Sequence, residues 1–454
     1  MKCHRLPARP AGRALLSAWV ACAAPGVLAP CPGVLADTPV ASQSETSLGS
    51  VEQEIQKALS APGAVTPRTS KSLPKELRAV FEQHGADATR AGWNLLCAQG
   101  MECSPSQERE LLAALAQRPW PELLEIMDAP QSMAQTSPSS LCARVLVLGM
   151  CAPADSLPKL LEHVHQVVQS GPERRARTVA DFALESFFAN HPASALELGR
   201  TTALDGRLLE QVVRALGKSR NTLGLAFLLE TLEAHAELAD LVVPQYQQIG
   251  PGQCFETNEA ITASLQRLFA NARPQTASAA ARALGRFGHP ASAPALIEQA
   301  ANPESGLREA CEWALCEISG LRLQGGAEAW KRWLDTEQAW YEVDLPGTLA
   351  DLARGNEVRV VAALRTLSQH RFFRHEFAGH IEPMLTHAKA DVRVAACRAL
   401  GDLRSPLATK ALVNILAWPD EATRAAARQA LGLLHQRELP VEPTAVRALF
   451  ALEG

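Results

Sequence analysis

The sequence predicts an all-α protein built as an α-solenoid, in which antiparallel helix pairs stack one after another. Ala and Leu dominate the 454 residues, whereas aromatic residues make up only 5% and Tyr occurs twice. That balance favours helices packed on helices over a β-sheet. No run of alternating apolar and polar residues between turn signals predicts a strand. Similar short segments recur from about residue 140 to the C-terminus, as expected of a repeat architecture.

The clearest recurring marker is Ala-Leu-Gly at the end of a predicted helix. It occurs four times, at 215–217, 283–285, 399–401 and 430–432. Leu148, Leu216 and Leu284 are separated by 68 residues each, and Leu400 and Leu431 by 31. These spacings indicate a unit of 31–34 residues, which accommodates two helices and two turns.

Each part of the unit has a physical interpretation. We interpret the Gly as the left-handed residue that ends the first helix. Pro begins the second helix, where its missing N–H costs nothing. Acidic residues in the linkers 302–304 and 418–421 precede the next helix, where the helix dipole favours negative charge. The Pro residues in question are Pro290, Pro294, Pro406 and Pro443.

In the most regular stretch, 391–402, Asp391 is expected to cap the helix and Cys397 to lie in the core. An Arg also recurs eight residues before the Gly position, as Arg308, Arg393 and Arg424. We interpret this row as a ladder of ion pairs between neighbouring repeats. The alternative is a row that captures phosphate or an acidic peptide.

Asp-Val-Arg-x-x-Ala-x-x-Ala-Leu-Gly at 391–401, followed by Pro and a Leu-rich helix, resembles HEAT repeats of the bacterial type similar to phycobilisome-lyase repeats. The resemblance is strong over 275–320 and 346–434 and weaker over 139–235, and residues 37–135 do not share it. It implies a right-handed superhelix that binds proteins on its concave face.

The N-terminus has the pattern of a secretory signal peptide. Residues 2–13 carry four positive charges, Ala14–Ala29 is apolar and uncharged, and Val34-Leu35-Ala36 suits a signal peptidase. Cleavage after Ala36 would leave a chain of net charge −8 instead of −4. A lipid anchor at Cys22 is the alternative. No later stretch is long and apolar enough to span a membrane.

The predicted organisation has five parts. They are a signal peptide (1–36), a flexible Ser/Thr/Pro-rich linker (37–73), an N-terminal helical region (74–135), a HEAT-like array with an irregular insertion near 245–253 (139–343) and C-terminal HEAT-like repeats (344–454).

Eight Cys remain after the leader, and an exported chain can form disulfides. Cys97 and Cys103 bracket a bend, and Cys142 and Cys151 bracket a helix end expected at Gly149. Either pair could close a loop if its Cα atoms lie within about 7 Å. Three others are interpreted as buried small apolar residues, namely Cys311, Cys316 and Cys397.

Two irregular stretches carry aromatic residues. Residues 321–343 contain a Trp-rich helix, interpreted as closing a sub-array or as an exposed anchor for a partner. Residues 370–380 hold three His and an acid, but His375 and His380 are five apart, which does not put them on one helix face. The residues that could bind a partner are Trp330, Trp333, Trp340, Tyr341, Phe372 and Phe373.

The sequence therefore predicts a non-catalytic, exported scaffold, periplasmic or extracellular, that binds an unidentified protein partner. We predict no cofactor, no metal and no catalytic residue, because nucleophile, phosphate-loop and dinucleotide motifs are absent. One alternative is a lyase-like or chromophore-handling HEAT protein. Another is a nucleic-acid-binding array, which the acidic net charge and the leader disfavour.

Overall fold

The computed structural model describes residues 41–60, 74–97, 105–128, 138–169, 174–200, 206–436 and 438–450. Every regular element in these ranges is helical, which confirms the all-α prediction. The chain divides into two units, 1–46 and 47–454. Of the first unit only residues 41–46 are described, and they are helical. The predicted leader and its Cys22 lie outside the described residues.

Five helices precede the repeats within the described ranges. They are α1 (Ala41–Leu59), α2 (Lys75–His84), α3 (Ala86–Cys97), α4 (Pro105–Leu115) and α5 (Trp120–Asp128). The predicted linker 37–73 contains a helix over 41–59, which is longer than the short helical segment Val51–Leu59 that the sequence indicates within it. Val51, Ile55 and Leu59 are buried. Their spacing of four puts them on one helix face, so this part of the chain packs against the protein instead of acting as a flexible tether.

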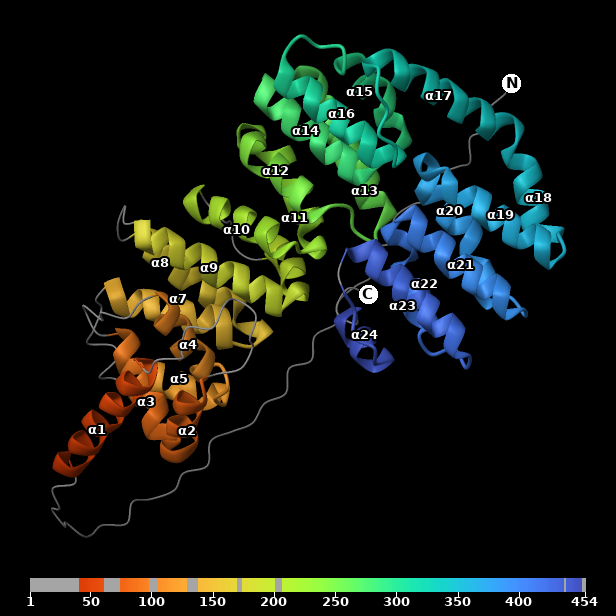
Figure 1. Cartoon of the computed structure of the whole chain (residues 1–454). Helices are drawn as coiled ribbons and strands as arrows, with labels where there is room; N and C mark the ends of the chain where they lie inside the picture. The colour runs from red at the N-terminus through yellow and green to blue at the C-terminus, as the bar shows by residue number, and fades with distance from the viewer. Residues whose placement is uncertain are drawn as a thin grey trace, which may run out of the picture. The chain divides into compact units, whose positions relative to one another are not determined.

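The first array consists of two layers of helices (Figure 1). The first layer contains α7 (Pro138–Cys151), α9 (Arg174–Asn190), α10 (Gly206–Ser219), α12 (Ala239–Ile249), α14 (Pro274–Phe287) and α16 (Ser305–Ser319). The second contains α8 (Leu157–Gln169), η2 (Pro192–Arg200), α11 (Leu225–Ala234), α13 (Phe255–Asn271), α15 (Ala293–Gln299) and α17 (Gly326–Val343). Each first-layer helix contacts the next one along the chain. The short η1 (Ala154–Ser156), η3 (Thr222–Gly224), η4 (Ala236–Leu238) and η5 (Pro290–Ser292) lie in turns.

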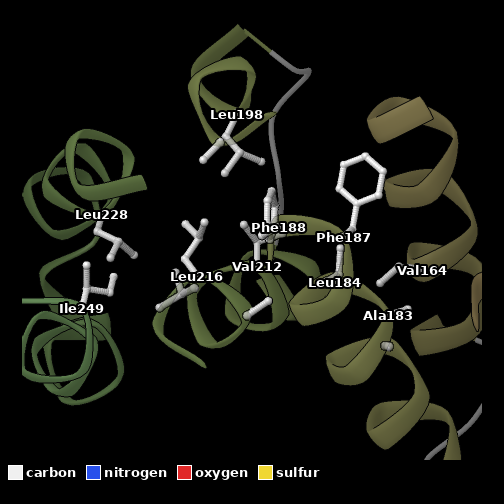
Figure 2. Packing of buried hydrophobic residues seen from close by; sticks show 14 of the residues in the cluster. Val164, Ala183, Leu184, Phe187, Phe188, Leu198, Val212, Leu216, Leu228 and Ile249 are labelled. Carbon is white, nitrogen blue, oxygen red and sulfur yellow. The ribbon is translucent and has the colours of Figure 1, made fainter. Parts of the chain in front are cut away.

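The core of this array is continuous from one repeat to the next. Figure 2 shows Leu216 of α10, Leu228 of α11 and Ile249 of α12 lying close together, and all three are buried. Phe187 and Phe188 of α9 are also buried and meet edge to face, with ring centroids 6.2 Å apart. Because a single helix pair cannot bury its own apolar face, each repeat depends on its neighbours for stability.

The C-terminal array follows the same plan. It contains α18 (Leu345–Arg354), α19 (Glu357–Gln369), η6 (Arg371–Phe373), α20 (Arg374–Ile381), η7 (Glu382–Thr386), α21 (Ala390–Leu403), η8 (Pro406–Ala408), α22 (Thr409–Ile415), α23 (Glu421–His435) and α24 (Pro443–Phe450). Here α19 packs on α21 and α21 on α23. The buried residues form two clusters, one ending at Leu334 with the later Phe372, the other beginning at Leu345. Among the described residues, none of the helices combines the length and apolarity needed to cross a membrane.

The glycine of Ala-Leu-Gly does not end its helix, so this prediction is wrong. Helix α14 continues past Gly285 to Phe287, and α21 past Gly401 to Leu403. A Cβ added to Gly285 would lie 2.6 Å from the Cα of Ala314 in α16. The glycine is needed because neighbouring first-layer helices approach too closely for any side chain. The same holds for Gly149, whose Cβ would lie 2.5 Å from the carbonyl oxygen of Ala183.

Two other local predictions have different outcomes. Proline begins the second helical segment of the repeats as expected, with Pro290 opening η5 and Pro406 opening η8. The irregular insertion predicted at 245–253 is shorter than expected, because α12 continues through Pro244 to Ile249. Only 250–254 is non-helical, and the Asn258 side chain holds it through hydrogen bonds with the backbone N–H and C=O of Gly252.

Arg393 links two repeats, as predicted. Its side chain is 9% exposed, and its guanidinium lies 2.5 Å from the carboxylate of Asp420, the N-cap of α23. It also donates to the carbonyl of His387 and lies over the ring of Trp418, 5.3 Å from the centroid. Arg424 instead pairs with Glu421 of its own helix. The predicted ion pair between neighbouring repeats therefore forms at Arg393 but not at Arg424.

We expect Asp420 to make stability depend on pH. Hydrogen bonds from Thr423 and Arg393 lower the pKa of Asp420 from 3.8 to about 2. A carboxyl whose pKa falls on folding contributes its full stabilisation above about pH 4 and loses it as the pH falls towards 2. In urea unfolding, the stability difference between the wild type and Asp420→Ala should shrink over that range.

The partner variant provides the control. In Arg393→Met the depression of the Asp420 pKa should be smaller, so the acid-dependent loss should be smaller too. Parallel stability curves for the wild type and Asp420→Ala between pH 6 and pH 2 would contradict this account.

Candidate functional site

A hollow of about 610 Å³ lies where the C-terminal ends of several first-layer helices meet the beginning of α20. Its lining includes the C-terminal ends of α9, α10, α12, α14, α16, α21 and α23. Among the described residues, five arginines line it, namely Arg220, Arg286, Arg371, Arg374 and Arg404. Glu317 is the one acidic side chain among those same lining residues. We call this feature the arginine hollow.

The helix ends determine where two of these arginines lie. Arg220 directly follows α10 and Arg404 directly follows α21, with φ of 53° and 54°. Such left-handed residues follow many helices and are usually Gly, since a Cβ is strained there. Gly288 after α14 and Gly320 after α16 take the same conformation at the equivalent step. Gln436 after α23 is a third non-glycine residue of this kind, with φ of 49°, and it also lines the hollow.

Arg374 holds the first array against the second. Its side chain is 6% exposed, and Nη2 donates to the carbonyls of Glu317, at 2.6 Å, and Ile318 at the end of α16. Burial, reinforced by the charge of Arg371, lowers the pKa of Arg374 to about 9. The guanidinium therefore stays charged at neutral pH and complements the negative end of the α16 dipole.

Arg371 is different, because its Nε is buried and has no hydrogen-bond partner among the described residues. Burial lowers the pKa of Arg371, and the charge of Arg404 lowers it further, whereas Glu317 and Asp402 raise it. The two cations Arg371 and Arg404 thus lie close enough to repel each other, and Glu317 and Asp402 act in the opposite direction.

His375 also lies between the two arrays, and both of its ring nitrogens have protein partners. Its Nε2 lies 2.9 Å from the carbonyl oxygen of Phe287, and its Nδ1 3.0 Å from the hydroxyl of Ser405. Burial lowers the pKa of His375 to about 4, so the neutral ring donates to the carbonyl and accepts from the hydroxyl. Across the described ranges, no cluster of three His, Cys, Asp or Glu could hold a metal ion.

The predicted partner-binding aromatic residues come together, but mainly as packing between α17 and the segment η6–α20. Trp333 contacts both Trp330 and Phe372 edge to face, with centroids 5.6 and 5.2 Å apart. Trp330 is 1% and Phe372 3% exposed. Their burial leaves no surface for a partner, so the anchor assignment is wrong for these two. It remains a prediction for the partly buried residues Trp333, Trp340, Tyr341 and Phe373.

The polar groups of this aromatic cluster between α17 and η6–α20 also contact other residues of the protein. The Tyr341 hydroxyl donates to the carboxylate of Glu376 at 2.9 Å. The Trp340 ring stacks on His370 at 3.4 Å, and His370 lies 2.9 Å from Glu337. These contacts tie α17 to α19 and α20.

The predicted disulfides are not supported where they can be tested. Cys142 and Cys151 lie on one continuous helix, α7, because the expected helix end at Gly149 does not occur. Nine residues of helix separate their Cα atoms by about 13 Å, well beyond the reach of a disulfide. Cys97 has a free thiol in the structure, and Cys103 lies outside the described residues.

Sequence reasoning missed the arginine hollow. Arg220 and Arg404 are 184 positions apart in the chain, and no local motif connects them. One signal was available, since each follows the glycine of Ala-Leu-Gly by three positions, at which α14 has Gly288. An Arg at a position that favours Gly is a departure that could have been noticed.

The C-terminal array is similar to a known family of repeats. Residues 378–452 match the family model of HEAT repeats. Among curated proteins, no sequence matches this chain. Solved structures similar to it include a mutant of Kap121p, with 14% identity over 87% of this chain and 48% of that one, at a TM-score of 0.32. The karyopherin Kap121p bound to the SUMO protease Ulp1p is similar at 13% identity and a TM-score of 0.32, over 88% and 42% of the two chains.

The chain spans less than half the length of these karyopherins. The matched segment comprises α20 to α24, the part in which α21 and α23 repeat the Ala-Leu-Gly helix. The same pairing of helices in two layers extends from α7 to α24 among the described residues. HEAT repeats are therefore identified by sequence over residues 378–452, and the described helices before that segment share its two-layer arrangement.

Proposed function

We propose that this protein is an exported, non-catalytic HEAT-repeat scaffold that mediates protein–protein interaction. The observation that carries this proposal is the arginine hollow, whose lining includes the C-terminal ends of seven different helices. Such a surface binds through many side chains spread over several repeats. Its guanidinium groups, prolines and leucines are suited to holding a ligand.

Export is supported by the N-terminal pattern of charges, apolar residues and the cleavage-type sequence Val34-Leu35-Ala36. We expect the full chain, tagged at its C-terminus and expressed in its native host, to be recovered from the envelope fraction. Mass spectrometry should give a new N-terminus at Asp37. A lipid-bearing N-terminus at Cys22 would favour membrane anchoring instead, and an unprocessed cytoplasmic pool would contradict export.

The scaffold role is tested by crosslinking the tagged chain in envelope extract and identifying captured proteins. The expected result is one or a few proteins captured in proportion to the bait, and absent from a control with the tag alone. The proposal would be overturned if no protein is captured while a small molecule from the same extract raises the melting temperature of the chain.

A further inference from the structure

The arginine hollow is strongly cationic in a chain that is acidic overall. Five arginines and one glutamate line it, whereas the whole chain carries a net charge of −4. Part of this positive charge has a structural explanation, because helix C-termini favour nearby cations. Arg374 accounts for that role at the end of α16 through its hydrogen bonds to two carbonyls.

Two other arginines are not explained by helix capping. The backbone N–H of Arg404 donates to the carbonyl of Leu400, as the N–H of Gly288 does to Leu284 after α14. Glycine therefore caps the helix equally well and without strain. Arg220 and Arg404 add only a cation to what glycine provides, and both line the same hollow. Within the described residues, neither guanidinium donates a hydrogen bond to a carbonyl or a carboxylate.

Arg371 completes the argument, since its buried Nε has no partner in the described part of the chain. A buried donor without an acceptor is costly in an isolated protein, and it becomes favourable when a ligand supplies the acceptor. The hollow thus contains guanidinium donors from three separate helix ends and too few acceptors for them. This deficit indicates an anionic ligand.

We propose that the arginine hollow binds an acidic peptide segment of the protein partner, with ligand carboxylates accepting hydrogen bonds from Arg220, Arg371 and Arg404. This inference rests on the proposed scaffold function. The planar guanidinium group of an Arg can donate two parallel hydrogen bonds to one carboxylate. Leu223, Ile249 and other apolar side chains of the lining provide contacts for the hydrocarbon parts of a peptide.

A nucleic acid fits less well than a peptide. Nucleic-acid binding depends on neutralising many phosphates along an extended basic surface. Here the basic groups are confined to one hollow of about 610 Å³, and the chain around it is acidic on balance. An acidic peptide needs only a few paired carboxylates and leaves the rest of the surface uninvolved.

The test uses the full chain and a fluorescein-labelled hexaglutamate peptide, followed by fluorescence anisotropy at physiological salt. Hexaglutamine is the neutral control ligand, and inorganic phosphate and a single-stranded DNA hexamer are competitors. Hexaglutamate should bind, and hexaglutamine should not. The proposal fails if the two peptides bind equally, or if phosphate or DNA displaces hexaglutamate at concentrations below that of the unlabelled peptide.

The variant Arg404→Gly relieves a left-handed non-glycine residue, so it should raise the melting temperature above that of the wild type. It also removes a cation from the arginine hollow and should weaken hexaglutamate binding about tenfold, the effect of one charge-assisted hydrogen bond. The control Arg365→Met removes a cation from an exposed position on α19 that does not line the hollow, so it should leave hexaglutamate binding unchanged. Arg220→Gly should behave like Arg404→Gly. Unchanged affinity in both arginine variants would overturn the proposal, and misfolding cannot imitate the expected result.

The same variants separate this inference from the proposed function. If the double variant Arg220→Gly, Arg404→Gly captures the same crosslinked proteins as the wild type, the arginine hollow is not the partner site, while the scaffold function stands. If the wild type binds hexaglutamate but captures no protein, the anion site stands and the scaffold function fails.

Discussion

Gly285→Ala is expected to destabilise the first array by about 1–3 kcal/mol, the usual cost of overpacking a well-packed interface. A Cβ at this position would lie 2.6 Å from the Cα and 2.8 Å from the Cβ of Ala314. The Cα and Cβ of Ala314 are fixed by the backbone of α16, so no side-chain rotation can move them away. The helices α14 and α16 would have to separate. Urea unfolding monitored by circular dichroism measures the loss.

The sign of this effect makes the test sharp. In an exposed helix position, replacing Gly by Ala stabilises a helix by up to about 1 kcal/mol. Gly306, near the beginning of α16, has no atom within 4 Å of the added Cβ and is the matched control. Gly306→Ala should be neutral or stabilising. If Gly285→Ala behaves in the same way, close helix approach is not the reason for the glycine.

Arg374→Met is expected to cost about 2–4 kcal/mol, because it removes a buried charged donor from several acceptors at once. The guanidinium donates to Glu317 and Ile318 of α16, in the first core cluster, and its Nε to the carbonyl of Arg371 at 3.0 Å. The helix that carries it, α20, contributes Phe377 and Ile381 to the second cluster. Loss of these bonds should uncouple the two arrays.

Calorimetry of the full chain measures this uncoupling. We expect the C-terminal array of Arg374→Met to unfold in a separate transition at lower temperature than in the wild type. Arg374→Lys should rescue little, because one ammonium cannot reproduce the planar fork of donors. Arg365→Met, at an exposed position on α19, is the control and should stay within about 0.5 kcal/mol of the wild type. A wild-type transition in Arg374→Met would show that the aromatic packing of η6 alone holds the arrays together.

Much of the fold was predictable from local chemistry. Alanine and leucine periodicity indicates helices, Pro290 and Pro406 mark second segments, and Cys397 proves fully buried. The ion pair between Arg393 and Asp420 also follows from the sequence, because a recurring Arg and an acidic helix cap occur at fixed spacing in neighbouring repeats. Each of these inferences depends on a residue and its near neighbours.

The wrong predictions concern residue types that can play either of two structural roles. A glycine after Ala-Leu can end a helix through left-handed backbone, or it can permit close helix approach. At Gly285 the sequence is compatible with both, and only the contact with Ala314 decides between them. Trp330 and Phe372 are a similar case. An aromatic residue in an irregular stretch can be an exposed anchor for a partner, or it can be buried between two helical segments, as both of these residues are.

The sequence by itself determined an all-α chain of repeated helix pairs with a HEAT-type motif, because helix formation and capping depend on residues a few positions apart. Only the tertiary structure decided where the cationic surface lies. Arg220, Arg371 and Arg404 come from the ends of different helices, and their positions in the sequence do not show that these ends meet. Stacking of the repeats brings these ends together, and it is this convergence that creates the arginine hollow.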